Sequence, residues 1–334
     1  MAKHTAEQAY KIACHHYQTA DYDSAEALCR QILRAVPGHR DALLLLAILA
    51  QRGGRTTEGD DCLRQAVESK DFSITLDTRL DSRPRWSPHA GISAILAAGL
   101  ERYRETLQAF EHYLPWLDKI AFDTTPQYPG APHWNNVWMP VLDAAALYCL
   151  VALKRPHRYV EIGSGNSTKF VARAVADHDL KTRIISIDPQ PRAEVDPLCS
   201  EIVRKPLEQC NLETFSALDT DDIVFVDSSH RSYMNSDVTV FFCEILPQLA
   251  SGVIVGIHDV FLPHDYPEDW IGRYYSEQYL LACYLLAGTQ RFEITLPVFY
   301  AASQGLGGSL LQQVRSKKKD ASWQNGTSFW MRMR

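Results

Sequence analysis

Several features are missing from this sequence of 334 residues, and each absence narrows the class of protein. No run of about 18 or more apolar residues occurs, so no segment has the length of a membrane-spanning helix. The first residues lead into an amphipathic pattern without the apolar core of a signal peptide. The eight cysteines include no CxxC pair of the kind found in zinc and redox sites. We therefore expect a cytoplasmic protein with reduced, mostly buried thiols and no membrane contact.

An excess of positive charge is also absent. The chain has 34 Lys and Arg against 40 Asp and Glu, a formal net charge of −6, which on average repels a phosphate backbone. We expect no nucleic-acid partner and favour a small-molecule or glycan substrate. The remaining composition, 46% hydrophobic and 22% charged residues, is that of an ordinary folded protein. Its length allows one sizeable α/β domain and a smaller module.

An internal repeat occupies the N-terminal fifth of the chain. Between residues 6 and 70 the sequence matches itself at an offset of 34 residues, the tetratricopeptide period. Ala13 returns as Ala47 and Ala25 as Gly59, small residues that suit a closely packed helical hairpin. The segment resembles a pair of tetratricopeptide repeats, so we predict a small all-α helical-repeat module over residues 1–70. The resemblance implies that these helices bind a peptide or protein partner, or mediate self-association.

The rest of the chain predicts a connector and a second domain. Helical periodicity over 90–116 is followed by a Pro- and Gly-containing run at 125–134, so residues 71–130 should form a helical connector and a junction loop. After an expected helix at 141–153, strands and helices alternate as in parallel sheets. The predicted strands span 158–162, 183–187, 202–204, 222–226, 253–257, 292–299 and 327–333.

No good helix lies between the last two predicted strands, so we expect them to pair in antiparallel fashion. The predicted fold class of residues 131–334 is therefore α/β. It has a doubly wound, mostly parallel seven-stranded sheet that ends in an antiparallel C-terminal hairpin.

A glycine turn follows the first predicted strand. Glu161-Ile-Gly-Ser-Gly165 leads from an apolar strand into a helix. Its glycines let the backbone approach a ligand that the first helical N–H groups can hold. Such a turn is by itself a weak signal. The next strand, however, ends at Asp188, a place from which a carboxylate can bind ribose hydroxyls. Capping a helix before Pro189 is the alternative role for Asp188.

Three further segments extend this pattern: Asp222-Ile-Val-Phe-Val-Asp-Ser-Ser-His230, Gly252-Val-Ile-Val-Gly-Ile-His-Asp259 and Gly326-Thr-Ser-Phe-Trp-Met-Arg332. With them, nearly two thirds of the chain resembles the class I S-adenosylmethionine-dependent methyltransferases, most closely a bacterial small-molecule or sugar-type branch. The resemblance implies an enzyme with S-adenosyl-L-methionine as cofactor. The cofactor-binding residues that it implies are Glu161, Gly163, Ser164, Gly165, Ser167, Asp188 and Asp227. The sequence departs from the family pattern at the usual third glycine, where Ser167 stands.

Candidate catalytic residues follow the fourth and fifth strands. Asp227 and His230 come after the fourth strand, and His258 and Asp259 after the fifth. Since the carboxyl ends of neighbouring parallel strands face one crevice, these side chains should meet there. Methylation of a hydroxyl requires loss of its proton, and we predict His230, His258 and Asp227 as the catalytic residues. The histidines could instead hydrogen-bond the loops.

A divalent cation such as Mg²⁺ is a further candidate cofactor at this crevice. Asp227 and Asp259 would be its ligands, since hard oxygen atoms suit that ion. The two neighbouring imidazoles would suit a transition metal better.

An aromatic loop braced by prolines spans 261–270, directly after this crevice. Binding residues concentrate on loops at the carboxyl edge of such sheets, so we predict that the loop covers the methyl acceptor. The candidate substrate contacts are His264, Tyr266, Trp270 and Arg273. An ordinary surface loop capped by Trp270 is the alternative.

The favoured function is S-adenosylmethionine-dependent O-methylation of a small molecule or sugar, by in-line methyl transfer with a His or Asp base. A hydroxylase or an NAD-dependent oxidoreductase on a related fold is an alternative. However, Gly163-x-Gly165-x-x-Thr168 lacks the third glycine of the dinucleotide fingerprint. Another alternative is a non-catalytic helical-repeat adaptor with an inactive methyltransferase-like domain.

Overall fold

The computed structural model describes residues 6–68, 88–124, 130–136, 138–307, 312, 316 and 326–334. The chain divides into two compact units, Met1–Arg79 and Leu80–Arg334. The predicted boundary after residue 70 lies outside the described residues. The predicted boundary after residue 130 falls inside the second unit, so it does not separate a connector from the sheet.

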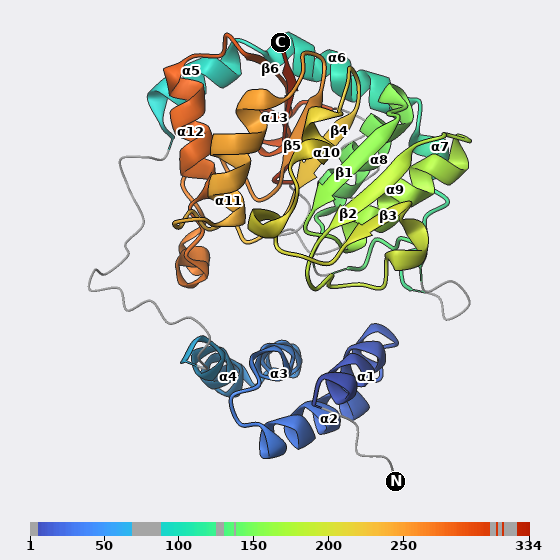
Figure 1. Ribbon diagram of the computed structural model, residues 1–334, viewed down its shortest axis with the longest axis vertical. Helices are drawn as coiled ribbons and strands as arrows, with labels where there is room; N and C mark the ends of the chain where they lie inside the picture. The colour runs from blue at the N-terminus through green and yellow to red at the C-terminus, as the bar shows by residue number, and fades with distance from the viewer. Residues whose placement is uncertain are drawn as a thin grey trace. The chain divides into compact units, whose positions relative to one another are not determined.

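The first unit contains four described helices in two successive pairs (Figure 1), which are α1 (Ala6–Gln18), α2 (Tyr22–Ala35), α3 (Arg40–Arg52) and α4 (Thr56–Glu68). Helices α1 and α3 begin 34 residues apart, as do α2 and α4, so the sequence period is the period of a helix pair. Small residues lie where these helices pack. Ala13 and Ala25 are fully buried, and a Cβ at Gly59 would lie 2.8 Å from the side chain of Gln51. Membership of the tetratricopeptide family stays a prediction.

The second unit is built on a seven-stranded sheet flanked by helices (Figure 1). Its strands are β1 (Arg158–Ile162), β2 (Arg183–Ile187), β3 (Glu201–Val203), β4 (Ile223–Val226), β5 (Ile254–Ile257), β6 (Phe292–Pro297) and β7 (Phe329–Met333). Its described α-helices are α5 (Ala90–Ala97), α6 (Leu100–Glu111), α7 (Leu114–Leu117), α8 (Val141–Lys154), α9 (Asn166–Asp177), α10 (Glu213–Ser216), α11 (Asp237–Val240), α12 (Glu277–Ala287) and α13 (Val298–Ser303). The described 3₁₀-helices are η2 (Asp196–Leu198), η3 (Leu207–Gln209), η5 (Leu246–Gln248) and η6 (Glu268–Arg273), and η4 (Phe241–Ile245) is a π-helix.

The strand order is β3-β2-β1-β4-β5-β7-β6. Strands β1 to β5 pair in parallel, and β7 runs antiparallel to both β5 and β6. The predicted fold class is therefore confirmed. The register aligns the carboxyl ends of the central strands, because Ile162 pairs with Ile187 and Val226, and Val226 pairs with Ile257. The segments that follow β1, β2, β4 and β5 therefore all emerge at the same edge of the sheet.

The sequence-based element boundaries differ from the structure mainly near the C-terminus. We predicted a strand through residue 299 and no helix before the last strand, but β6 ends at Pro297 and α13 occupies Val298–Ser303. Proline lacks the N–H that a strand ladder needs, and the alanines that follow favour a helix. The predicted strands at 202–204 and 327–333 are shifted or shortened by one or two residues, as element ends commonly are.

Helices α5 to α7 belong to the core of the sheet unit. Buried Ile92, Leu96 and Tyr103 share one hydrophobic cluster with the central strands. The guanidinium of Arg102 on α6 donates a hydrogen bond to the carbonyl oxygen of Ile294 on β6 at 2.8 Å. The described part of the expected connector is thus helical, but it packs as an integral layer of the second unit.

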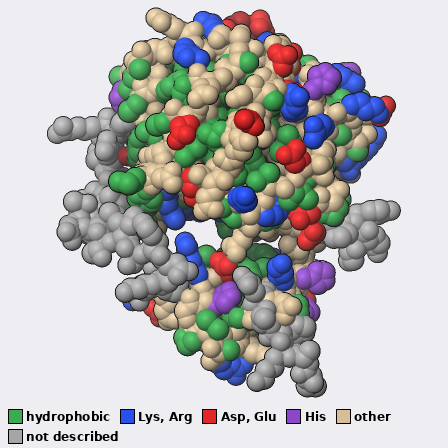
Figure 2. All heavy atoms as spheres, in the orientation of Figure 1, with side chains coloured by type: hydrophobic (Ala, Val, Ile, Leu, Met, Phe, Trp, Pro, Cys, Tyr) green, Lys and Arg blue, Asp and Glu red, His purple; other side chains and the backbone are tan. Residues whose placement is uncertain are grey.

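The surface of the described residues adds three observations. None of their helices combines the length and the apolar character needed to span a bilayer. All eight cysteines are free thiols, and Cys243 and Cys283 are exposed, whereas we expected mostly buried thiols. On the face drawn in Figure 2, the basic side chains lie among acidic ones.

Candidate functional site

The glycine turn after β1 passes close to the end of β4. Gly163 has a φ of +83°, and a Cβ at this position would lie 1.9 Å from the carbonyl oxygen of Asp227. Only glycine fits this backbone and this space. The N–H of Gly163 donates to the carbonyl oxygen of Ile187 at 3.0 Å, so the turn is held between the ends of β2 and β4.

A cavity of about 330 Å³ lies at this edge of the sheet, within the range of about 300–1,000 Å³ typical of small-molecule sites. Six of the seven predicted cofactor-binding residues line it, namely Gly163, Ser164, Gly165, Ser167, Asp188 and Asp227. The segments before α8 and after β2, β3 and β4 complete the wall with residues that include Trp138, Met139, Arg192, Pro206, Leu207, Glu208 and Asp237.

Glu161, the seventh, lies beneath the turn and does not line the cavity. It is fully buried. Its carboxylate accepts a hydrogen bond from the Thr168 hydroxyl and another from Tyr159 Oη at 2.7 Å. Burial raises the pKa of Glu161 to about 7 despite these hydrogen bonds. Glu161 therefore supports the start of α9 from inside the core, and its expected contact with the cofactor stays a prediction.

Asp188 joins the turn to the end of β2. One carboxylate oxygen accepts a hydrogen bond from the N–H of Ser164 at 2.6 Å, and the other accepts from the N–H of Gln190 at 2.7 Å. Burial outweighs these N–H groups and raises the pKa of Asp188 above its ordinary value. Each carboxylate oxygen has a second lone pair, and the side chain lines the cavity, so it can also accept hydrogen bonds from ligand hydroxyls.

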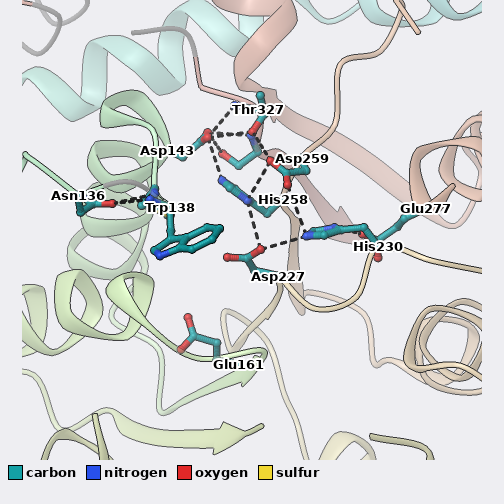
Figure 3. A network of polar contacts seen from close by, with 12 residues as sticks. Asn136, Trp138, Asp143, Glu161, Asp227, His230, His258, Asp259, Glu277 and Thr327 are labelled. Carbon is teal, nitrogen blue, oxygen red and sulfur yellow. Dashed lines mark hydrogen bonds and ion pairs between the residues drawn. The ribbon is translucent and has the colours of Figure 1, made fainter. Parts of the chain in front are cut away.

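The four polar residues after β4 and β5 meet as predicted (Figure 3). Oδ1 of Asp227 lies 3.2 Å from Nε2 of His230 and 3.4 Å from Nδ1 of His258. Asp259 approaches the same two ring nitrogens, 3.5 Å from His230 Nε2 and 3.4 Å from His258 Nδ1. The backbones of His230 and Asp259 are left-handed, with φ of +57° and +56°, a conformation uncommon outside glycine that often marks functional sites.

Only Asp227 of these four residues lines the cavity. His230 and His258 are 1% and 2% exposed. The predicted catalytic imidazoles therefore lie behind Asp227 and do not face the cavity themselves. The physical reason is that the residues after β5 are covered by neighbouring elements, as the contacts of His258 with α8 show.

Two further carboxylates hold the outer nitrogens of the imidazoles (Figure 3). Asp143 on α8 lies 3.2 Å from Nε2 of His258, and Glu277 at the start of α12 lies 2.8 Å from Nδ1 of His230. Asp143 also accepts hydrogen bonds from the backbone N–H groups of Thr327 and Ser328, both at 2.7 Å. It therefore ties α8 to β5 and to the segment that enters β7.

The charges of this cluster stabilise one another. Burial opposes ionisation of Asp227, but His258 and His230 outweigh it and hold the pKa of the carboxyl well below its ordinary value. Burial likewise disfavours charge on the imidazoles, yet the surrounding carboxylates raise the pKa of His230 and of His258 well above the ordinary value. The cluster thus favours the ionised form of Asp227 at the cavity and the charged forms of the two imidazoles behind it.

The predicted substrate contacts do not line the cavity either. The guanidinium of Arg273 lies over the ring of Trp270 at 3.6 Å. Trp270 and Tyr266 each pack against Tyr275, whose ring is 4.6 Å from that of His230. His264 packs edge-on against Phe299. The loop after β5 is thus an aromatic cluster that contacts the site through His230, and its acceptor-binding role stays a prediction.

The predicted divalent cation gains no support from the geometry. Within the described ranges, no group of three or more His, Cys, Asp or Glu side chains is arranged to hold a metal ion. Asp227 and Asp259, its expected ligands, face the two imidazoles. Metal binding stays a prediction.

The sequence did not predict that Asp143 and Glu277 contact the two histidines; Glu277 was expected only as a residue that could line the pocket. A buried partner for Asp143 could have been predicted from the sequence. Asp143 is the lone acid in the apolar run Val141-Leu-Asp-Ala-Ala-Ala-Leu147, and a charge on an otherwise buried helix needs a partner. Glu277 had no such signal, because an acid in the first turn of a helix is common.

Residues 160–260 match the family model described as a methyltransferase domain. The matched segment runs from β1 to just past β5 and holds the glycine turn, Asp188, Asp227 and the His258–Asp259 pair. This segment is therefore similar to methyltransferase domains. The match covers less than a third of the chain, and the sheet of the second unit extends beyond it to β6 and β7.

Two solved structures show a weak likeness to the chain. One is a mutant of the O-GlcNAc transferase of Thermobaculum terrenum, with 12% identity over 67% of this chain and 46% of that chain and a TM-score of 0.22. This chain thus spans less than half the length of that protein. The other is a crystal structure of PH0851, with 9% identity over 97% of this chain and 86% of that chain and a TM-score of 0.33. Such TM-scores do not establish a shared fold. No curated protein matches the sequence.

Proposed function

We propose that this protein transfers a methyl group from S-adenosyl-L-methionine to a hydroxyl group of a small molecule or sugar. One observation carries the proposal. The glycine turn, Asp188 and Asp227 all lie within the segment that matches a methyltransferase domain, and all of them line a single cavity.

The residues present suit this cofactor. Asp188 offers carboxylate oxygens to a ribose diol, as acids at the end of the second strand do in such sheets. The turn leads into the N-terminus of α9, which favours an anionic group such as the carboxylate of the methionine moiety. Met139, Pro206 and Leu207 add apolar wall against which a nucleobase can pack. S-adenosyl-L-methionine, when bound, supplies a methyl group on a positively charged sulfur.

Asp227 is the residue that we assign to the acceptor. As the cluster member on the cavity wall, it can accept a hydrogen bond from the acceptor hydroxyl and orient its oxygen for in-line attack. A hydroxyl oxygen that gains a methyl group becomes strongly acidic, so even a carboxylate with a depressed pKa can take its proton. His230 and His258 keep that carboxylate ionised and oriented, so we assign them a supporting role in the proposed base.

The alternative functions fit the structure less well. Dinucleotide-binding sheets of nicotinamide enzymes have the order 3-2-1-4-5-6 in parallel, whereas here the antiparallel β7 lies between β5 and β6. No observation among the described residues favours a hydroxylase. An inactive adaptor would not require the glycine turn, Asp188 and Asp227 to line one cavity.

Calorimetric titration tests the cofactor. S-adenosyl-L-methionine should bind to the purified full-length chain, NAD should not, and Asp188→Ala should weaken binding at least tenfold. Glu213→Gln, a change on the exposed surface of α10, is the matched control. Absence of binding to the unmodified protein, or equal affinity of the Asp188→Ala variant, would refute the proposal.

The acceptor class is tested with methyl-labelled cofactor. Label should pass to members of a panel of phenols, catechols and monosaccharides, and Asp227→Asn should abolish transfer. Transfer to amines alone would contradict O-methylation.

A further inference from the structure

Glu277 is a buried carboxylate whose contacts point to one role. It is 1% exposed, and its Oε2 lies 2.8 Å from Nδ1 of His230. Among the described residues, its Oε1 has no hydrogen-bond partner. A buried polar group left unpaired costs about 1–3 kcal/mol, so this side chain is poorly explained as a stabiliser of α12.

The contact with His230 continues to the cavity. Nε2 of His230, the nitrogen opposite the one that Glu277 holds, lies 3.2 Å from Oδ1 of Asp227. Figure 3 shows the three side chains in one line, with the imidazole between the two carboxylates. Glu277 thus acts on the cavity through one intermediate ring.

Backbone hydrogen bonds hold the main chain of His230, but they do not fix the orientation of its imidazole ring. The N–H groups of Ser276 and Glu277 donate to the carbonyl oxygen of His230 at 2.8 and 3.1 Å. These bonds hold the main chain of His230, whereas rotation of its imidazole is limited by Tyr275 on one side and by the carboxylates at its two nitrogens.

Asp143 provides the contrast. It holds His258 in a comparable way, but it also accepts hydrogen bonds from two backbone N–H groups and is therefore needed for the fold itself. The side chain of Glu277 has its one hydrogen bond, among the described residues, with His230.

We propose that Glu277 is a positioning residue, which fixes the ring of His230 and thereby holds the Asp227 carboxylate toward the acceptor. The inference rests on the proposed function, in which Asp227 contacts the acceptor hydroxyl.

Two variants of the full-length chain test it. Glu277→Leu removes the hydrogen bond to His230, while Glu277→Gln keeps an acceptor oxygen of similar reach. In crystal structures, the His230 ring should turn away from Asp227 in the Leu variant and stay in place in the Gln variant. Glu277→Met offers the same comparison as the Leu variant if that variant does not fold.

Kinetics give the second readout. With labelled cofactor and an accepted phenol or sugar, Glu277→Leu should lower kcat at least tenfold, as loss of an orienting partner typically does. Glu277→Gln should retain most of the activity. The affinity for S-adenosyl-L-methionine should stay within twofold in both variants, because Glu277 does not line the cavity. Glu293→Gln, at a partly exposed position on β6 that ion-pairs with Arg334, is the matched control.

An unmoved His230 ring in the Leu variant would overturn the inference, as would an equal loss of kcat in the Leu and Gln variants, which would assign the effect to charge. If the unmodified protein methylates no acceptor, the proposed function fails by that result alone. The crystallographic comparison then still decides whether Glu277 positions His230.

Discussion

The buried carboxyl of Glu161 should make the stability of the second unit depend on pH. Burial raises its pKa from 4.5 to about 7, although hydrogen bonds from neighbouring hydroxyls partly oppose the change. Between these two values the folded protein keeps a proton that the unfolded chain has already released. The free energy of unfolding should therefore fall as the pH rises through this window, and the loss should be complete above about pH 7.

The size of this effect follows from the two pKa values. One pH unit corresponds to about 1.36 kcal/mol per linked proton, so a rise from 4.5 to about 7 amounts to about 3 kcal/mol in total. Most of it, about 2.5 kcal/mol, should be lost between pH 5 and pH 8.

Glu161→Gln isolates the contribution of this carboxyl. The amide has nearly the shape of the protonated acid and does not titrate, so the variant should lack this part of the pH dependence. Urea unfolding of both proteins at pH 5 and pH 8 measures the difference. Glu213→Gln on exposed α10 should behave like the unmodified protein. If the variant and the unmodified protein lose the same stability between the two pH values, the reasoning is refuted.

Three further predictions concern the cavity and its surroundings. Gly163→Ala should abolish calorimetric binding of S-adenosyl-L-methionine, because its Cβ would lie 1.9 Å from the carbonyl oxygen of Asp227; affinity within threefold of normal would contradict this. Asp143→Leu should lower the free energy of unfolding by about 3–5 kcal/mol, because it leaves His258 and two backbone N–H groups without their hydrogen-bond partner. A loss below about 1 kcal/mol in urea unfolding would count against this prediction. EDTA should leave methyl transfer unchanged, because Asp227 and Asp259 already face imidazoles; a loss that added Mg²⁺ restores would support the predicted cation.

The sheet could be predicted because its evidence is local. Each of β1, β2 and β4 is a short apolar run followed by a glycine or an acid, and such runs reflect strands buried on both faces. The antiparallel end of the sheet was also predictable, although α13 was missed because its first residues, Val298 and Phe299, favour a strand as readily as a helix.

The site was only partly predictable. Knowing that parallel strands share a carboxyl edge was enough to bring Asp227, His230, His258 and Asp259 together. The rule says which side chains gather, but not which of them reaches the cavity. That depends on the left-handed turns at His230 and Asp259 and on the helices that cover them, which come from distant parts of the chain.

The sequence by itself determined the alternation of strands and helices, the glycine turn at 163 and the acids that end β2 and β4. All of these are set by local backbone preferences and by the period of apolar residues. The tertiary structure alone decided that Glu161 supports the turn from inside the core, that the imidazoles stand behind Asp227, and that Asp143 reaches His258 across 115 residues of chain. Burial and hydrogen bonding between distant segments are products of packing, and no local pattern encodes them.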